Sequence, residues 1–311
     1  MSASPRSNTD PKVLPSSTHG PELSGERFVV AYRISADDEA TARARAEDLC
    51  VEQTVEFPAD LLPAGPIPDQ IVGRLEELTP APVAEEEAAD GTADPPAFIA
   101  EVSYADEIAG GELTQLLNVI FGNSSLKRGL RVEDLRLSRR LLEHFRGPRF
   151  GVPGLRSLCG AGDERPMLCT ALKPLGLSAK ELASLAGAFA EGGIDLIKDD
   201  HGLADQPFCR FAERAERCAQ AVAEANAKTG GKTRYVVNIS FDAEHLPDRA
   251  AYARRMGAGG FLAAPGLLGF ATVKRLADDD ALGLPVLAHP AFLGSFVVYR
   301  DAGIAPGLIF G

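Results

Sequence analysis

Charged and ligating side chains follow one apolar run of the sequence without a break. After residues 194–197 the chain places Lys198, Asp199, Asp200 and His201 in succession. Strands of parallel sheets are buried on both faces and read as continuous apolar runs, and barrel enzymes gather their catalytic groups where such strands end. Four charged or ligating groups in a row are unfavourable to bury unless they share a metal ion, a substrate or water. This stretch therefore predicts a chemical site at the end of a strand.

Other strand ends carry groups of the same kind. Lys173, Asn238 and His289 each follow another apolar run. Because the parallel strands of one barrel end at one mouth, we expect these side chains to meet residues 198–201 there. Lys173 can act as an acid or base if a neighbouring cation lowers its pKa. His289 is a further catalytic candidate, and Asn238 a candidate substrate contact.

Lys198 has a second chemical option. A neutral lysine can add carbon dioxide and become a carbamate, which is an oxygen ligand. With Asp200 and a third group, this carbamate would suit Mg²⁺, because hard cations favour oxygen ligands. His201 could be the third ligand, or it could hydrogen-bond the strand end without touching a metal. An imidazole is also a softer ligand than a carboxylate, so the site could instead bind manganese or zinc, or no metal.

Structural roles are the alternative for each of these residues. Lys198 could form an ion pair with one of the aspartates that follow it, and Lys173 could be a surface lysine. His289 could stabilise its strand end, and Asn238 could close a turn. The residue types alone leave both sets of roles open.

Strands and helices alternate from about residue 166 onward. Apolar runs predict five strands, at residues 166–172, 194–197, 235–239, 260–264 and 285–288. A capping box at Ser178 and Glu181 starts one predicted helix, and residues 207–228 predict the next. Such repeats are typical of right-handed βα units and a parallel sheet. A closed (β/α)8 barrel needs eight strands and about 250 residues, so we expect a TIM barrel truncated after about five strands.

The part of the chain before the barrel has an α+β pattern. It predicts strands at residues 28–34, 52–57 and 98–104 and a helix at residues 37–50. Residues 80–96 include three successive glutamates with Ala and Pro, which favours a solvated loop. Residues 1–26 are rich in Ser, Pro and Gly and lack the apolar core of a signal peptide, so we expect a disordered tail.

The composition excludes several classes of protein. A formal net charge of −12 argues against nonspecific nucleic-acid binding, which needs basic patches. No run reaches the roughly 18 apolar residues of a membrane span. The five scattered cysteines form no CxxC pair, which argues against a disulfide framework or a zinc knuckle. We expect a cytoplasmic protein that binds neither nucleic acid nor membranes.

Several motifs, in order along the chain, resemble the ribulose bisphosphate carboxylase/oxygenase (RuBisCO) large-subunit family. Residues 192–201, GGIDLIKDDH, resemble its metal-site strand, whose form is GG-L-D-x-x-K-D-D-E. Residues 170–178, TALKPLGLS, resemble its first-strand motif T-I-K-P-K-L-G-L-S. Residues 118–122 and 130–136 resemble the end of its N-terminal domain. The resemblance runs from about Phe28 to the last residue.

The resemblance implies a domain organisation and an oligomer. A ferredoxin-like α+β domain would cover residues 27–145, and the incomplete barrel residues 146–311. In this family one subunit's N-terminal domain covers the barrel mouth of its partner. We therefore expect a homodimer or a higher homo-oligomer.

The resemblance also implies roles for single residues. Lys198 would be the carbamylated ligand of Mg²⁺ and Asp200 the second ligand, while Lys173 would move protons at the substrate. Asn118 would come from the partner subunit to hold substrate or carbon dioxide during catalysis, and Glu52 would lie beside it at the substrate.

Departures from the family pattern bear on the activity. His201 stands where the third metal ligand is glutamate, and the second lysine of the first-strand motif is missing after Pro174. Pro290 follows His289, where the carboxylases carry an arginine that grips a phosphate, and residues 52–57 lack their Thr-Trp pattern. Losing an arginine and a lysine from one mouth weakens a site for a bisphosphate. The chain therefore resembles the RuBisCO-like (form IV) branch.

The resulting expectation is an enzyme that acts on a phosphorylated ketose or keto-acid through a metal-stabilised enediolate. It would be an enolase or isomerase, or a transcarboxylase/hydrolase. One alternative is a non-catalytic relative that binds a ligand or partner, which His201 and the lost basic groups favour. The intact Lys173, Lys198 and Asp200 oppose it. A genuine carboxylase is the second alternative, and the departures disfavour it.

Overall fold

The computed structural model describes residues 23–82 and 96–310 of the chain. The expected tail at residues 1–26 and the expected loop at residues 80–96 lie almost entirely outside this part. The chain divides into two compact units: Met1–Phe145 with Phe296–Gly311, and Arg146–Ser295. We call them unit 1 and unit 2.

Unit 1 is built on a five-stranded sheet with the order β10-β4-β1-β3-β2. Its strands are β1 (Arg27–Ser35), β2 (Arg74–Pro80), β3 (Ala97–Ala105), β4 (Leu130–Arg136) and β10 (Ala302–Ile304). Neighbouring strands are antiparallel, except that β10 runs parallel to β4. Its helices include α1 (Glu39–Glu52), α2 (Leu113–Phe121), α3 (Arg139–Leu142), α11 (Pro306–Phe310) and the short turns η1 (Ala59–Leu61), η2 (Ile67–Ile71), η3 (Asp106–Ala109) and η4 (Asn123–Leu126).

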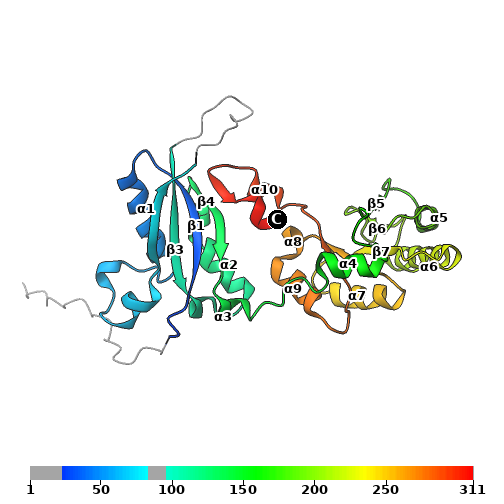
Figure 1. Cartoon of the computed structure of the whole chain (residues 1–311), viewed down its shortest axis with the longest axis horizontal. Helices are drawn as coiled ribbons and strands as arrows, with labels where there is room; N and C mark the ends of the chain where they lie inside the picture. Colours follow the sequence, from blue (N-terminus) through cyan, green and yellow to red (C-terminus); the bar gives the residue numbers. More distant parts are fainter. Residues whose placement is uncertain (1–22, 83–95, 311) are drawn as a thin grey trace, which may run out of the picture. The chain divides into compact units, whose positions relative to one another are not determined.

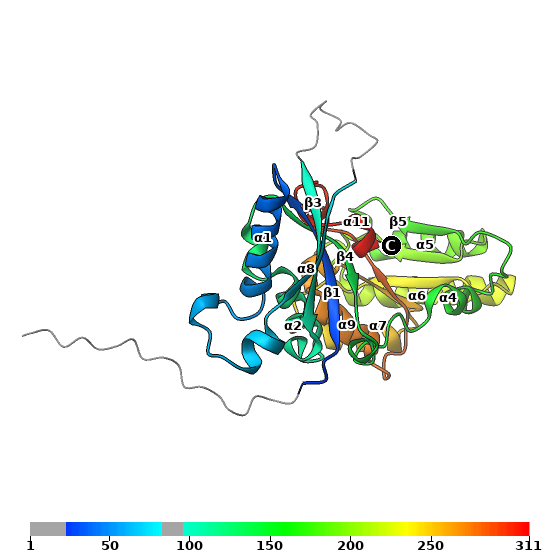
Figure 2. The ribbon, with the colours of Figure 1, turned by 60° about the vertical axis from the view of Figure 1, so that its left-hand side comes forward.

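One face of the unit 1 sheet forms the core. Alternate residues of β1 are fully buried, namely Phe28, Val30, Tyr32 and Ile34. They pack in one cluster with Leu49 of α1 and with residues of α2 such as Ile120. Figures 1 and 2 show α1 alongside this sheet.

Two predictions for unit 1 need correction, and not all of its strands were predicted. Residues 52–57 are not a strand, because Leu49 and Cys50 pack in the core and extend α1 to Glu52. The strands β2 and β4 were not predicted; β2 is polar and largely exposed along its length. Residues 296–310, expected in the barrel domain, belong to unit 1, because β10 pairs with β4.

Unit 2 contains a five-stranded parallel sheet in sequence order, as the repeats predicted. Its strands are β5 (Cys169–Leu172), β6 (Leu196–Asp199), β7 (Arg234–Asn238), β8 (Gly260–Ala263) and β9 (Val286–Ala288). Its helices are α4 (Gly151–Cys159), α5 (Ala179–Glu191), α6 (Phe211–Thr229), α7 (Leu246–Arg255), α8 (Pro265–Leu268) and α9 (Phe270–Asp278), with α10 (Gly294–Val297) at its end. The predicted capping box of Ser178 and Glu181 starts α5.

The two faces of this sheet contact different partners. Ile197 and Val237 belong to the large core that also contains residues of α5, α6 and α7. Leu196, Val236 and Leu262 point to the other face, where Leu155 and Cys159 of α4 pack. In a complete barrel this second face would be the interior. The alternation along β6 therefore decides which of the following charged residues face inward.

Candidate functional site

The predicted site residues after β6 divide between the two faces of the sheet. Lys198 and Asp200 continue the alternation of Leu196 and lie on the inner face, whereas Asp199 lies on the helix-covered face with Ile197. Asp199 is fully buried, and Asp200 is not. The apolar run of β6 therefore places one lysine and one carboxylate at the mouth and keeps the other carboxylate in the core.

Lys173 and Asp200 meet at the ends of the neighbouring strands β5 and β6. Nζ of Lys173 lies 3.3 Å from Oδ1 of Asp200, and the N–H of Gly202 donates to Oδ2 at 3.4 Å. Partial burial raises the pKa of Asp200, but the hydrogen bonds from Lys173 and Gly202 and the charge of His201 outweigh it and lower the pKa. Asp200 is therefore an ionised acceptor beside an ammonium group.

Two imidazoles stack at the same mouth. The rings of His201 and His289 have centroids 4.2 Å apart and an interplanar angle of 16°. Partial burial, followed by the charges of His201 and Lys198, lowers the pKa of His289. Its Nδ1 accepts the N–H of Ala291 at 3.2 Å, a contact that requires this nitrogen to be unprotonated. Because β6 and β9 are not neighbours in the sheet, this contact joins distant strand ends.

Lys198 does not form the ion pair that was its structural alternative. Its Nζ donates to the backbone carbonyl of Asp199 at 3.4 Å. The carboxylate of Asp199 instead pairs with Arg214, and that of Asp200 pairs with Lys173. Lys198 is half-buried and faces the mouth, where an added oxygen group would lie on the same face as Asp200.

The donor set allows a direct test of the expected metal site. Within residues 23–82 and 96–310, no three His, Cys, Asp or Glu side chains are arranged to hold an ion. Asp200 and His201 do lie together, with Nδ1 of the imidazole 3.5 Å from Oδ1 of the carboxylate. The residues fit a divalent cation only if Lys198 supplies the third ligand, which requires that it lose its positive charge.

Asn238 makes structural contacts at the end of β7. It is buried, and its Nδ2 donates to the carbonyls of His201 at 3.0 Å and Leu203 at 2.8 Å. Its Oδ1 accepts the N–H of Ser240. Both amide protons are used within the protein, so Asn238 holds the loop after β6. By the alternation along β7 its side chain lies on the same face as Val236, and its contact with a substrate stays a prediction.

Glu52 and Asn118 lie in unit 1, at the end of α1 and within α2. Gln53 Nε2 donates to the carbonyl of Val119 at 2.6 Å. This bond joins their sequence neighbours, so the end of α1 lies next to α2. Glu52 is half-buried and Asn118 is exposed. Their contribution to a partner's mouth stays a prediction.

Sequence reasoning missed the buried partners of Asp199. Tyr235 OH donates to Oδ1 at 2.7 Å, and Arg214 Nε donates to Oδ2 at 3.0 Å. Arg214 is 0% exposed. The available signal was its position three residues after Phe211 and four before Cys218, on the apolar stripe of α6.

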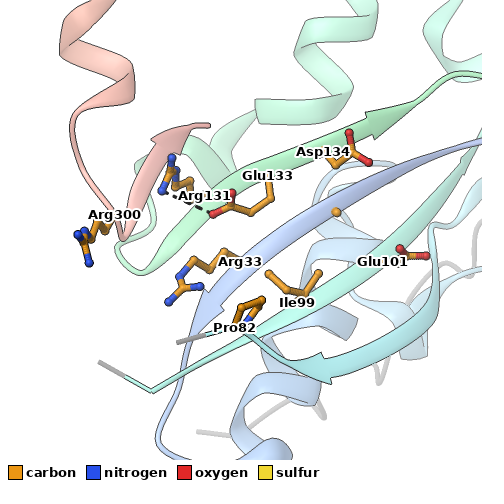
Figure 3. Close-up of a pocket in the computed structure, with 9 residues that line it drawn as sticks. Arg33, Pro82, Ile99, Glu101, Arg131, Glu133, Asp134 and Arg300 are labelled. Atoms are coloured by element: carbon orange, nitrogen blue, oxygen red, sulfur yellow. Dashed lines mark ion pairs between the residues drawn. The ribbon is translucent and has the colours of Figure 1, made fainter. Parts of the chain in front are cut away.

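A separate cavity of about 460 Å³ lies on unit 1, and none of the predicted site residues lines it. Figure 3 shows its charged lining, and Arg131 and Glu133 form an ion pair there at 3.6 Å. Glu101 pairs with Arg136 at 2.5 Å. The cavity lining consists of Ala31, Arg33, Pro82, Ile99, Glu101, Arg131, Glu133, Asp134 and Arg300. The carboxylates of Glu133 and Glu101 are therefore paired with arginines of the same sheet.

No helix in the described part of the chain is both long enough and apolar enough to span a lipid bilayer.

Comparisons with known proteins give a consistent result. The family model "Ribulose bisphosphate carboxylase large chain, catalytic domain" matches residues 155–309. The 5-methylthioribulose-1-phosphate isomerase of Rhodospirillum rubrum is 37% identical over 92% of this chain and 71% of its own length. The 2,3-diketo-5-methylthiopentyl-1-phosphate enolase of Geobacillus thermodenitrificans is 34% identical over 68% of this chain, which spans about half (52%) of the enolase.

A solved structure extends the similarity to the fold. The Rubisco-like protein of Rhodopseudomonas palustris superposes with a TM-score of 0.78 at 40% identity, over 92% of this chain and 73% of that chain. This confirms the predicted fold class, an α+β domain followed by a barrel.

Proposed function

Because the chain belongs to the RuBisCO large-chain family, among its RuBisCO-like enzymes, we propose that it transfers protons on a phosphorylated ketose or keto-acid through an enediolate. The reaction would be of the isomerase or enolase type and would not fix carbon dioxide. The observation that carries the proposal is the 3.3 Å contact between Lys173 Nζ and Asp200 Oδ1 at one mouth.

The substrate class follows from the relatives. Both named relatives act on five-carbon sugar phosphates or diketo phosphates with a methylthio group. We therefore take 5-methylthioribulose 1-phosphate as the first substrate to test. A ketose of this kind isomerises when the proton on the carbon beside the carbonyl is removed and a proton is returned to the former carbonyl carbon.

Lys173 is the residue that we assign to proton movement. Its side chain is 63% exposed, so Nζ is accessible to a ligand at the mouth. The ionised Asp200 holds the ammonium group in place and accepts one of its hydrogen bonds. Lys198 is the second cation nearby, and its conversion to a carbamate would change the charge next to Asp200 by two units.

Mg²⁺ is the proposed cofactor, with Lys198 as a carbamate, Asp200 and His201 as its ligands. The ion would polarise the substrate carbonyl and stabilise the negative oxygen of the enediolate. His201 supplies a neutral nitrogen in place of a carboxylate oxygen, so we extend the proposal to Mn²⁺ and Zn²⁺. His289 is proposed to contact the substrate, since its ring lies against His201.

Carbon dioxide fixation on a bisphosphate is disfavoured by groups that are absent from the mouth. The residue after His289 is Pro290, and no lysine follows Pro174 directly. Each change removes a cation that a second phosphate would need. A substrate with one phosphate fits this smaller charge better.

The oligomer is part of the proposal. We propose a homodimer or a higher homo-oligomer in which Asn118 and Glu52 complete the partner's mouth. The bond between Gln53 and Val119 supports this, because it brings the helix segments that carry the two residues next to one another.

Deuterium exchange tests this function. The chain, with Mg²⁺ and bicarbonate, is incubated with 5-methylthioribulose 1-phosphate in D₂O, and the substrate and product carbons are followed by NMR. We expect deuterium at the carbon that loses its proton, and at least about a 100-fold loss of exchange in Lys173→Met. Lys180→Met, an exposed lysine at the start of α5, is the matched control. Equal exchange in both variants, or none in the unaltered chain, would contradict the proposal.

A further inference from the structure

A fully buried ion pair lies directly behind the candidate site. Arg214, in the first turn of α6, donates from Nε to Oδ2 of Asp199 at 3.0 Å, and both side chains are 0% exposed. Tyr235 OH and the N–H of Asn238 also donate to Asp199, at 2.7 and 3.0 Å. Three donors compensate for the burial of one carboxylate. The pair is on the helix side of the sheet, so it does not contact a ligand at the mouth.

The rest of the guanidinium group holds the loop between β6 and α6. Nη1 donates to the carbonyls of Ala204 at 2.8 Å and Cys209 at 3.3 Å, and Nη2 donates to that of Leu203 at 3.5 Å. From the side of β7, Asn238 donates to the carbonyls of His201 and Leu203. Two buried side chains therefore fix the backbone of this loop near both of its ends.

This loop begins with the residues that face the mouth. Asp199 and Asp200 are adjacent and point to opposite faces of the sheet. The backbone at these two residues therefore sets the orientation of both side chains. We propose that Arg214 is a positioning residue: by holding Asp199 and the loop carbonyls together, it sets how Asp200 and His201 face the mouth. Its effect on turnover rests on the proposed function, whereas its effect on the loop does not.

The geometry requires arginine in particular. A guanidinium group has five donors in a rigid fork, and here they reach one carboxylate and three carbonyls at once. A lysine at this position could still neutralise Asp199, but its single nitrogen could not also hold both ends of the loop. Arg214→Lys therefore separates loop positioning from charge compensation.

Arg165→Lys is the matched control. Arg165 forms two hydrogen bonds with Asp195, at 2.6 and 2.8 Å, just before β6 begins. It is an arginine–aspartate pair at the opposite end of the same strand. The same substitution there removes the paired guanidinium donors to Asp195 without changing a contact of the loop after β6.

The test measures hydrogen–deuterium exchange by mass spectrometry for peptides covering residues 200–209, together with turnover. In Arg214→Lys we expect loop exchange at least about tenfold faster, with kcat lower by roughly 100-fold and KM within about threefold. In Arg165→Lys we expect unaltered loop exchange and kcat. Should Arg214→Lys fail to fold, the double variant Asp199→Leu/Arg214→Met removes the buried charges as a pair and is expected to loosen the same loop.

Two results would overturn the proposal. One is loop exchange at the unaltered rate in Arg214→Lys, or in the double variant where the single one does not fold. The other is equal loosening of residues 200–209 in Arg165→Lys. If the unaltered chain does not turn over the sugar phosphate, the fault lies with the proposed function, and loop exchange alone decides the role of Arg214.

Discussion

Asp200 and Lys173, from the ends of two neighbouring parallel strands, form an ion pair at 3.3 Å, while the preceding carboxylate, Asp199, is buried on the other side of the sheet. The two aspartates of the Lys-Asp-Asp stretch thus have separate tasks. Asp199 is structural and Asp200 is available at the mouth.

Asp200→Asn removes the charge at the mouth. We expect Mg²⁺ affinity in the presence of bicarbonate to fall by on the order of 100-fold, because a ligand and the partner of Lys173 are lost together. Thermal unfolding should change little, because the side chain is not part of the core. Isothermal titration calorimetry measures the affinity, and Asp163→Asn at an exposed position is the control. Retained affinity in Asp200→Asn would rule out Asp200 as a ligand.

His201→Glu restores a carboxylate beside Asp200. Hard cations favour oxygen ligands, so we expect affinity for Mg²⁺ to rise by about tenfold relative to Zn²⁺. Competition titrations with the two metals measure the ratio. An unchanged ratio would show that residue 201 does not touch the metal.

Asp195→Asn tests an ion pair that stabilises unit 2. Asp195 is 4% exposed, accepts two bonds from Arg165 and also accepts the N–H of Leu168. The hydrogen bonds from Arg165, opposed by desolvation, lower its pKa. The variant should lower the free energy of unfolding at pH 7 by about 1–3 kcal/mol.

The same variant makes a prediction about pH. A carboxyl group whose folded pKa is depressed adds stability above its unfolded pKa of about 3.9, and this stability is lost as the pH falls through the folded value. The difference between Asp195→Asn and the unaltered chain should therefore shrink from pH 5 to pH 3. Urea unfolding across this range checks it, and a difference that grows on acidification would contradict the assignment.

Tyr235→Phe removes one of the three donors to Asp199. The hydroxyl and the carboxylate are both buried, so we expect a loss of about 1–3 kcal/mol in the free energy of unfolding. Tyr252→Phe is the control, because its hydroxyl makes a single 3.5 Å contact with the carbonyl of Ala212. Equal losses in the two variants would mean that the buried network adds nothing beyond packing.

The barrel strands could be predicted because strands that are buried on both faces are apolar throughout, as β6 and β8 are. The convergence of Lys173 and Asp200 followed from the parallel order of the strands. The amphipathic strand β2 could not be found in this way, because its exposed side chains are polar and it has no apolar run. Residues 52–57 were wrongly predicted as a strand, because their short alternation of polar and apolar residues belongs to the end of α1 and the turn after it.

The spacing of residues in the sequence did not predict the structural role of Asp199. Its partner Arg214 lies 15 residues later, on a helix whose charged residues read as a solvated face. The spacing of Arg214 from Phe211 and Cys218 places it on the apolar stripe of α6, but only the packing of α6 on the sheet shows that it reaches Asp199. The hydrogen bonds of Asn238 could not be predicted for the same reason, since they reach a loop whose path the sequence does not indicate.

The most direct test is a calorimetric titration of the chain with Mg²⁺, with and without bicarbonate, repeated for Lys198→Met and Lys180→Met. We predict that the unaltered chain and Lys180→Met take up Mg²⁺ tightly only when bicarbonate is present, and that Lys198→Met does not respond to bicarbonate. Mg²⁺ uptake that is independent of bicarbonate, or unaffected by Lys198→Met, would contradict a carbamate ligand at this mouth.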